Sequence, residues 1–152
     1  MGLDITPLYS RILLGSAPKH GKALARAGVD VLVLCAEELQ PRSSEFPGLH
    51  VLHAPMTDDA APGNFDTALA AAEIVKREWA KGRTVLITCA MGRNRSALVA
   101  ALALVFITDM SARDVVDHIR SLRHDPWGGI ALSNPMFLQF LVSLDRGRRR
   151  AG

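Results

Sequence analysis

The fold and the chemistry of this sequence are both decided by the stretch Thr84-Val85-Leu86-Ile87-Thr88-Cys89-Ala90-Met91-Gly92-Arg93-Asn94-Arg95-Ser96-Ala97-Leu98-Val99. Residues 85–87 form a short apolar run, which predicts a strand buried on both faces of a sheet. Residues 96–106 are rich in Ala and Leu and contain no helix breaker, which predicts a buried helix. Between them lies the loop 89–95, with a cysteine where the strand ends.

The loop 89–95 has the features of an anion-binding site. A loop that leads into a helix N-terminus presents several unpaired backbone N–H groups, and the helix dipole adds partial positive charge. Gly92 allows a sharp turn, and the planar guanidinium of Arg95 can bind two oxygens of a tetrahedral anion. The same field favours thiolate at Cys89, so we expect its pKa to lie below the free value of about 8.5. A nucleophilic thiolate in such a loop indicates phosphoryl transfer to sulfur.

The spacing of Cys89, Gly92, Arg95 and Ser96 resembles the C-x-x-G-x-x-R-S signature of the cysteine-dependent protein tyrosine phosphatases, in particular their dual-specificity branch. The motifs L-G-S at 14–16 and V-L-C-A-E-E at 33–38 are also similar to that family, so the resemblance extends over about residues 13 to 144. It implies a phosphocysteine intermediate on Cys89 and a hydrogen bond from Ser96 to the sulfur as it leaves. It also implies that phosphate is bound by the loop residues Ala90, Met91, Gly92, Arg93, Asn94 and Arg95.

One position departs from the family pattern, because Thr88 stands where the family usually has histidine. In the family this histidine orders the loop and stabilises the thiolate. A hydroxyl hydrogen bond from Thr88 is the available substitute. A catalytically weak module that binds phosphate groups is therefore one alternative to an active enzyme.

Two neighbouring carboxylates, Asp58 and Asp59, lie on a loop at 54–63 and are the candidates for a general acid. The leaving oxygen of a phosphomonoester needs a proton, which a carboxylic acid held over the anion site can supply. The resemblance implies an aspartate on this loop. If the family's aspartate is located by its distance after Pro55, it corresponds to Asp58. If it is located by its distance before Phe65, it corresponds to Asp59. We favour Asp58 and keep both, and the other one is then a solvated turn residue or the lead to a helix cap.

The apolar pattern of the whole chain predicts an α/β fold with a single, mostly parallel central sheet flanked by helices. Besides the strand at 85–87, we expect strands at 12–16, 29–34 and 49–54. Further helices are expected after the lead at 16–18 and through Ala27, at 65–81 with Asn64 as N-cap, at 111–123, and from the Asn134-Pro135 pair onward. One catalytic domain should span residues 1–145, followed by a disordered basic tail at 146–152.

The composition is that of an ordinary globular domain, with 152 residues, 49% hydrophobic and 22% charged residues and a formal net charge of +3. No apolar run approaches the length of a membrane span, and no secretory signal is visible. We therefore expect a cytoplasmic protein with no integral membrane association and no DNA partner. The histidines and cysteines show no metal-ligand spacing, so neither metal nor cofactor is expected.

Two cysteines in such a chain indicate thiol chemistry in a reducing compartment. Cys35 ends a strand that should neighbour the strand ending at Cys89. The resemblance implies a reversible disulfide that protects the nucleophile, and a buried small hydrophobic residue is the alternative.

The sequence predicts a dual-specificity or tyrosine protein phosphatase whose partner is a phosphorylated protein. Phosphotyrosine is the expected substrate, with phosphoserine and phosphothreonine as further candidates. Arg93 adds positive charge near the mouth of the loop, which would suit phosphoinositides, other phospholipids or RNA 5′-phosphates; a solvated loop charge is the alternative. A rhodanese-type sulfur transferase also uses a cysteine loop after a strand, but it needs no general acid.

Overall fold

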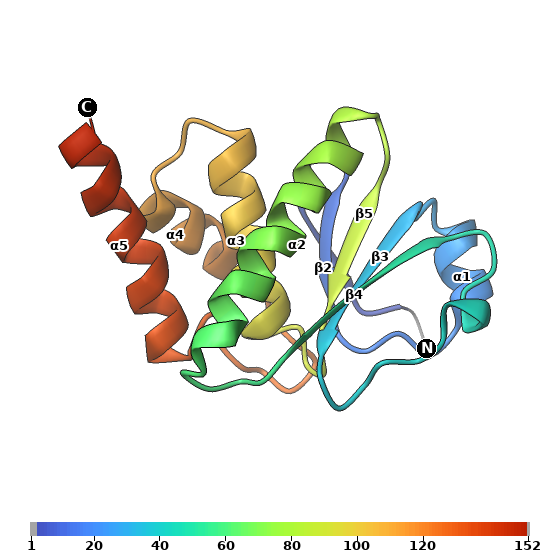
Figure 1. The fold of residues 1–152 in the computed structure, drawn as a ribbon. Helices are drawn as coiled ribbons and strands as arrows, with labels where there is room; N and C mark the ends of the chain where they lie inside the picture. Colours follow the sequence, from blue (N-terminus) through green and yellow to red (C-terminus); the bar gives the residue numbers. More distant parts are fainter. Residues whose placement is uncertain (1–2, 152) are drawn as a thin grey trace.

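Five strands form one sheet in the order β1-β2-β5-β3-β4 (Figure 1). The structure is a computed structural model, and it describes residues 3–151. The strands are β1 (Ile5–Tyr9), β2 (Ile12–Gly15), β3 (Val31–Ala36), β4 (His50–Met56) and β5 (Val85–Thr88). Neighbours among β2, β5, β3 and β4 are parallel, and β1 lies antiparallel to β2 at one edge. The predicted single, mostly parallel sheet is confirmed, whereas the sequence did not predict β1.

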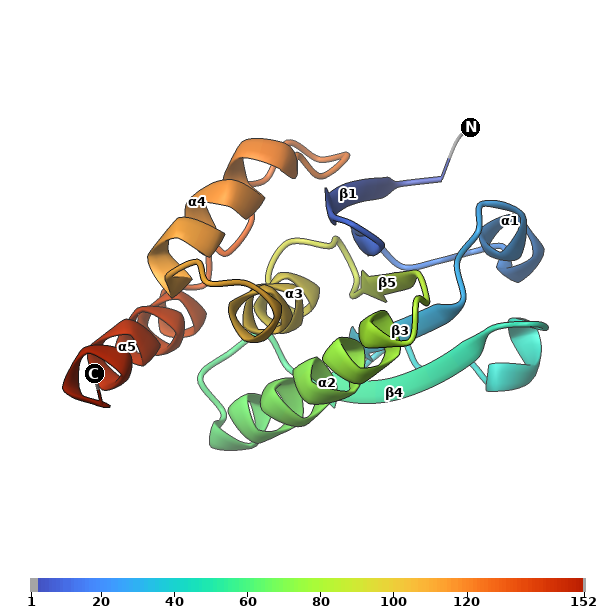
Figure 2. The same ribbon diagram turned by 90° about the horizontal axis from the view of Figure 1, so that it is seen from above.

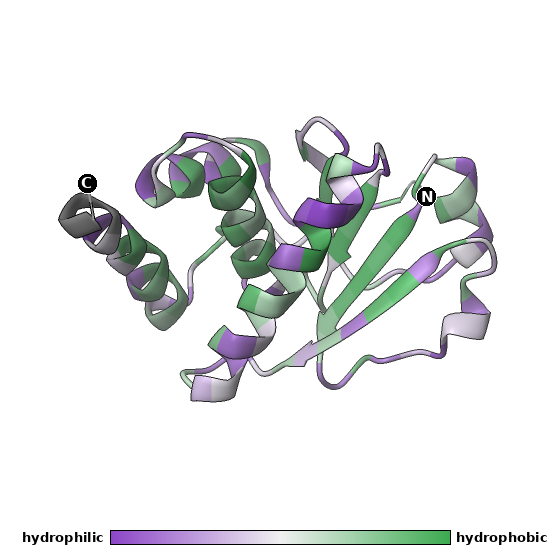
Figure 3. Ribbon diagram, turned by 45° about the horizontal axis from the view of Figure 1, so that its top comes forward, coloured by the Kyte–Doolittle hydropathy of each residue, from purple (hydrophilic) through white to green (hydrophobic). Residues whose placement is uncertain are grey.

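The central strands are buried because helices cover both faces of the sheet. Every residue of β3 and of β5 is buried, as expected for parallel strands with two covered faces. Figure 3 shows these strands as hydrophobic along their length, whereas the outer helices carry polar residues on one side. The side chains of β3 alternate, since Val31, Val33 and Cys35 belong to one core cluster and Leu32 and Leu34 to another.

The larger core lies under four helices on one face of the sheet (Figure 2). These are α2 (Pro62–Ala80), α3 (Arg95–Ile107), α4 (Ala112–Leu122) and α5 (Pro135–Ala151). The short helix α1 (Gly21–Arg26) and the 3₁₀ helix η1 (Ser43–Glu45) lie on the other face, where Leu24 and Phe46 cover the smaller core. Helix α3 is buried from Arg95 to Val105 and lies between the sheet and the outer helices. The predicted buried helix after the cysteine loop is therefore confirmed.

Three helix boundaries differ from the sequence prediction. Helix α2 begins at Pro62 and not after Asn64, because proline at the first helical position has its backbone already set for a helix. Helix α1 begins at Gly21, three residues after the expected lead at 16–18, and ends at Arg26 with Ala27 as its C-cap. Helix α5 continues to Ala151, so residues 146–151 extend a helix where we expected a disordered tail. Arginine and alanine are good helix formers, which accounts for this continuation.

The carboxyl ends of the parallel strands lie at one edge of the sheet, so the loops that follow these strands begin there. The loops after β2, β3, β4 and β5 all emerge there, at the lower edge in Figure 1, and the loop between α4 and α5 reaches the same edge. Ligand sites of open α/β sheets form at the carboxyl ends of the strands. None of the helices formed within residues 3–151 combines the length and apolar character that crossing a bilayer would take.

Candidate active site

The loop after β5 turns its backbone carbonyls outward. Five successive carbonyls accept hydrogen bonds from groups behind the loop: Ala90 from Ala17 N (3.1 Å), Met91 from Arg123 Nη2 (2.9 Å), Gly92 from Arg123 Nε (3.1 Å), Arg93 from Leu132 N (2.8 Å) and Asn94 from Leu98 N (2.8 Å). The C=O and N–H of one trans peptide point in opposite directions. The N–H groups of the following residues therefore face the inner side of the loop. Within residues 3–151, no backbone N–H of residues 90–94 donates to another protein group.

Gly92 occupies a place in the loop that no other residue fits. Its φ is +67°, in the left-handed region, and a Cβ there would lie 2.5 Å from Arg123 Nη2 and 2.6 Å from Gly15 O. Arg123 itself is 1% exposed. Its guanidinium pairs with both carboxylate oxygens of Asp4, at 2.7 and 2.8 Å. Partial burial alone would raise the pKa of Asp4, but the hydrogen bonds from Arg123 and Ser16 lower it, so the pair is ionised.

Arg95 is oriented by Glu38, which lies on the loop after β3. Glu38 accepts from Nη1 and, at 2.9 Å, from Nη2 of Arg95, and Met56 O accepts from Nη1 at 3.1 Å. These hydrogen bonds lower the pKa of Glu38. A guanidinium has five N–H donors, so Nε–H and one Nη2–H remain without a protein acceptor in the described part of the chain. Two such donors can bind two oxygens of one anion.

The cysteine and the serine of the motif are in contact. Cys89 Sγ lies 3.1 Å from Ser96 Oγ at the start of α3, and Cys89 is 5% exposed. Thr88, in contrast, donates its hydroxyl to Val33 O of the neighbouring strand at 2.9 Å. A hydroxyl has a single hydrogen to donate. Thr88 therefore does not supply a hydrogen bond to the sulfur.

The two candidate acids have different surroundings. Asp58 faces the cysteine loop, where its carboxylate accepts from Asn94 Nδ2 at 3.1 Å and from Asn134 Nδ2 at 2.8 Å. Asp59 instead accepts from Ala61 N at 2.9 Å and from Thr57 Oγ1 at 2.7 Å within its own loop. The hydrogen bond from Ala61 N, followed by that from Thr57, lowers the pKa of Asp59. The structure thus brings Asp58 to the cysteine loop and leaves Asp59 in the turn before α2.

Arg93 is paired and does not present a free charge. Its Nε lies 2.8 Å from Asp125 Oδ2, and Asp125 is 4% exposed. The hydrogen bond from Arg93 lowers the pKa of Asp125 to about 2. The positive charge that we expected at the mouth of the site is therefore offset by a buried carboxylate.

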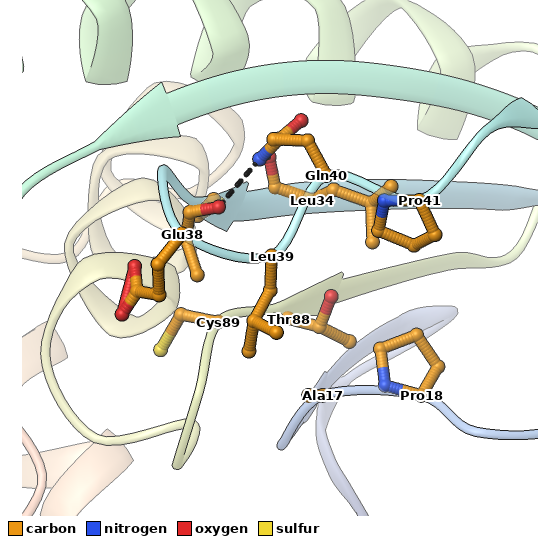
Figure 4. Close-up of a pocket in the computed structure, with 11 residues that line it drawn as sticks. Ala17, Pro18, Leu34, Glu38, Leu39, Gln40, Pro41, Thr88 and Cys89 are labelled. Atoms are coloured by element: carbon orange, nitrogen blue, oxygen red, sulfur yellow. Dashed lines mark hydrogen bonds between the residues drawn. The ribbon is translucent and has the colours of Figure 1, made fainter.

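A pocket of ≈ 330 Å³ lies beside Cys89, between the loops that follow β2 and β3 (Figure 4). Its lining includes Cys35, Cys89, Glu38 and Leu39. The β3–β5 register pairs Leu34 with Thr88, so the next position along places Cys35 beside Cys89. Both are free thiols in one core cluster. Burial raises the pKa of the Cys35 thiol well above its ordinary value, and the neighbouring Cys89 acts in the same direction.

Glu38 and Asn134 contact this site, although the sequence analysis gave neither a role there. Glu38 follows the carboxyl end of β3, at the same edge of the sheet as Cys89, and this position was the signal that could have found it. From the sequence we expected Asn134 to be structural, as the cap of the last helix. Across residues 3–151, no group of three or more His, Cys, Asp or Glu side chains gathers in a way that could hold a metal ion.

Comparison with known proteins gives the family of this fold. No protein-family model matches the chain. Human DUSP28 is similar in structure, with a TM-score of 0.81, 25% sequence identity, and coverage of 97% of this chain and 99% of the other. The chain has the fold of the dual-specificity phosphatases.

Two further solved structures extend the similarity across the phosphatase superfamily. Tk-PTP in its active form has a TM-score of 0.79 and 25% identity, and the match covers 96% of this chain and 99% of Tk-PTP. PTPMT1 in complex with PI(5)P has a TM-score of 0.79 and 20% identity, with coverage of 97% and 99%. The resemblance to cysteine-dependent protein tyrosine phosphatases of the dual-specificity type, read from the motif at 89–96, is confirmed by these neighbours.

Proposed function

We propose that this dual-specificity-phosphatase-like protein is a phosphomonoester hydrolase of the dual-specificity or tyrosine protein phosphatase type. The observation that carries the proposal is the set of five outward carbonyls at 90–94, which leaves inward N–H groups beside a sulfur. Two N–H donors of Arg95 have no protein acceptor within residues 3–151, and they can bind two oxygens of one anion. A dianionic phosphate ester matches this arrangement in charge and in shape.

In the first step, Cys89 Sγ attacks phosphorus in line with the leaving oxygen. The S–P bond forms as the P–O bond to the leaving group breaks, and the loop N–H groups and Arg95 stabilise the equatorial oxygens. Asp58 gives its proton to the leaving oxygen, so an alcohol or a phenol departs. We assign this role to Asp58 and not to Asp59, because only Asp58 accepts a hydrogen bond from a residue of the cysteine loop.

In the second step, water hydrolyses the phosphocysteine. The Asp58 carboxylate removes a proton from the water, the new P–O bond forms, and the S–P bond breaks. The electron pair returns to Cys89 Sγ, where the Ser96 hydroxyl at 3.1 Å donates a hydrogen bond to it. Inorganic phosphate is released and the enzyme is restored.

A phosphorylated protein is the substrate class that we favour. Asp125 offsets the charge of Arg93, so the loop lacks the surplus of positive charge that a polyanionic ligand would use. The second candidate is a phosphoinositide, another phospholipid or an RNA 5′-phosphate on the same scaffold. It is favoured by the similarity in fold to PTPMT1, which was solved with PI(5)P. A nucleophilic thiol requires a reducing compartment, and we propose the cytoplasm.

A third candidate is a catalytically weak module that binds phosphate groups. It is favoured by Thr88, whose hydroxyl donates to Val33 O and not to the sulfur. A module of this kind would bind phosphopeptides without turning them over.

The test is a panel of phosphotyrosine, phosphothreonine, phosphoinositide and RNA 5′-phosphate substrates, assayed with the wild type and with Cys89→Ser. We expect turnover of the phosphopeptides by the wild type, and binding without turnover by Cys89→Ser, because the N–H groups and Arg95 are unchanged. Retained turnover by Cys89→Ser would refute the phosphocysteine. Binding without turnover by the wild type would establish the weak module.

Asp58→Ala and Asp59→Ala form a matched pair for the general acid. We expect Asp58→Ala to lower turnover by roughly 10²-fold or more, the range typical of general acids. Asp59→Ala should change turnover less, because the donors to its carboxylate within residues 3–151 are Thr57, Ala61 and Asn64, around the start of α2, and not the cysteine loop. Small and equal effects would remove both residues from the mechanism. Thiosulfate sulfur-transfer activity that depends on neither residue would favour a rhodanese-type reaction.

A further inference from the structure

The structure holds the Asp58 carboxylate between two asparagine side chains that come from different parts of the chain. Asn94 Nδ2 donates to Oδ2 at 3.1 Å and Asn134 Nδ2 donates to Oδ1 at 2.8 Å. Asn94 belongs to the cysteine loop and Asn134 precedes α5, whereas Asp58 lies on the loop after β4. These three segments meet at the lower edge of the sheet in Figure 1.

The orientation of both amides follows from their other partners. Asn134 Oδ1 accepts from Met136 N at 3.0 Å and from Phe137 N at 3.3 Å, which caps the first turn of α5. Asn94 Oδ1 accepts from Asn134 N at 2.9 Å. Turning either amide over would place NH₂ against backbone N–H and an oxygen against the carboxylate. The side-chain NH₂ groups of Asn94 and Asn134 therefore face Asp58 and donate to its carboxylate.

We propose that Asn134 is a positioning residue for the reaction, which holds Asp58 over the cysteine loop through its side-chain NH₂. The proposal rests on the proposed function, because it concerns the proton that Asp58 gives and takes. Asp58 is itself an exposed residue, so burial does not fix its side chain. The two amides supply that restraint, one on each oxygen.

The arrangement suits a carboxyl group that must work in both protonation states. Each carboxylate oxygen can accept more than one hydrogen bond, so each oxygen that takes an amide N–H keeps a lone pair for a proton. The amides can thus hold the plane of the carboxyl group while the proton leaves in the first step and returns in the second. Asn94 alone cannot fix that plane, since one hydrogen bond leaves the group free to rotate about it.

Two variants separate this role from the cap of α5. Asn134→Ser keeps a good N-cap, because Ser and Asn are similar in this position, but its hydroxyl is too short to reach Asp58. Asn134→Asp keeps the cap oxygen and the shape, and replaces the donor with an oxygen that repels the carboxylate. Both should unfold within about 3 °C of the wild type, because the cap is retained.

The readout is the dependence of kcat/KM on the leaving group. The alcohol of an alkyl phosphate needs a proton from a general acid in order to leave, whereas an acidic phenol leaves an aryl phosphate as phenolate without one. For both variants we expect kcat/KM to fall by roughly 10-fold or more on the alkyl substrate, which is within the range for a displaced general acid. On the acidic aryl substrate, kcat/KM should fall by less than about 2-fold. In an Asp58→Ala background, Asn134→Ser should not lower kcat/KM further, because the carboxylate that Asn134 holds is already absent.

The outcomes distinguish failure of this inference from failure of the proposed function. Equal losses on both substrates, or no loss on either, would overturn the role of Asn134 while the wild type remains an active phosphatase. If the wild type turns over neither substrate, the proposed function itself fails. Ser111→Ala, which removes the cap of α4 at a distance from Asp58, is the control for general destabilisation and should affect both substrates alike.

Discussion

Replacing Gly92 by alanine should destabilise the protein more than the same change at Gly82, although both glycines have left-handed backbones. Their φ values are +67° and +84°. An alanine in this conformation costs about 1–2 kcal/mol at either position. At Gly82 a Cβ would have no neighbour within 4 Å, so that conformational term is the whole effect.

At Gly92 the new methyl group meets atoms that cannot move aside. Gly15 O, at 2.6 Å, is backbone, and Arg123 Nη2, at 2.5 Å, belongs to a side chain held by Asp4. Overpacking of this kind adds roughly 1–3 kcal/mol. The sum is about 2–5 kcal/mol for Gly92→Ala against about 1–2 kcal/mol for Gly82→Ala. In a domain of this size the melting temperature should fall by roughly 4–20 °C and 2–8 °C, respectively.

Thermal unfolding followed by circular dichroism measures both variants, and ³¹P NMR titration with inorganic phosphate reports on the loop. We expect Gly92→Ala to lose phosphate binding at temperatures where it remains folded, whereas Gly82→Ala keeps it. Equal melting temperatures for the two variants would show that the loop can relax around a methyl group. The close approach of Arg123 and Gly15 would then not be what requires glycine.

Glu38→Gln should lower kcat/KM by roughly 10-fold, because the Glu38 carboxylate orients the guanidinium that we propose binds phosphate. The melting temperature should change little, because Glu38 is exposed and the glutamine oxygen can still accept from the buried Arg95. Steady-state kinetics and a thermal scan check this. The pKa of Asp125 is lowered to about 2 by Arg93, whereas an unfolded aspartate titrates near 3.9. The stability from this pair is therefore present above about pH 4 and lost as the pH falls toward 2, and Asp125→Asn should flatten that part of an acid-unfolding curve. Peroxide should oxidise Cys89 to the sulfenic acid, which Cys35 then attacks to form a disulfide and water. Burial raises the pKa of Cys35, so the yield of disulfide measured by mass spectrometry should rise with pH. Sulfinic acid on Cys89 in place of the disulfide would show that the two cysteines do not pair.

The cysteine loop could be predicted from the sequence because its parts are contiguous. A strand, a cysteine, a glycine and an arginine stand together within residues 84–99, so the order of strand, loop and helix could be predicted from this stretch alone. The parallel sheet could be predicted from short apolar runs such as 29–34, which are typical of strands buried on both faces. Edge strand β1 has no such run, since only Leu8 of its residues is buried, and Pro7 within it argues against a central strand.

The partners of the loop could not be predicted, because they depend on contacts between distant residues. Glu38 and Arg95 are 57 positions apart and Asp58 and Asn134 are 76 apart. Counting along the chain also leaves the choice between Asp58 and Asp59 open, since one residue of insertion reverses it. The two are separated by their contacts in the folded chain: Asp58 accepts from Asn94 of the cysteine loop, whereas Asp59 accepts from Ala61 N in its own turn.

The contact between Arg123 and Asp4 spans 119 positions of sequence, and this separation has a consequence for biosynthesis. A nascent polypeptide stalled before residue 123 would already contain the whole C-x-x-G-x-x-R-S motif, yet the carbonyls of Met91, Gly92 and Arg93 would lack their donors from Arg123 and Leu132. Chemical competence should therefore arrive late and all at once, when the two extremities of the domain meet. Catalytic turnover would then serve as a stringent gauge of complete folding.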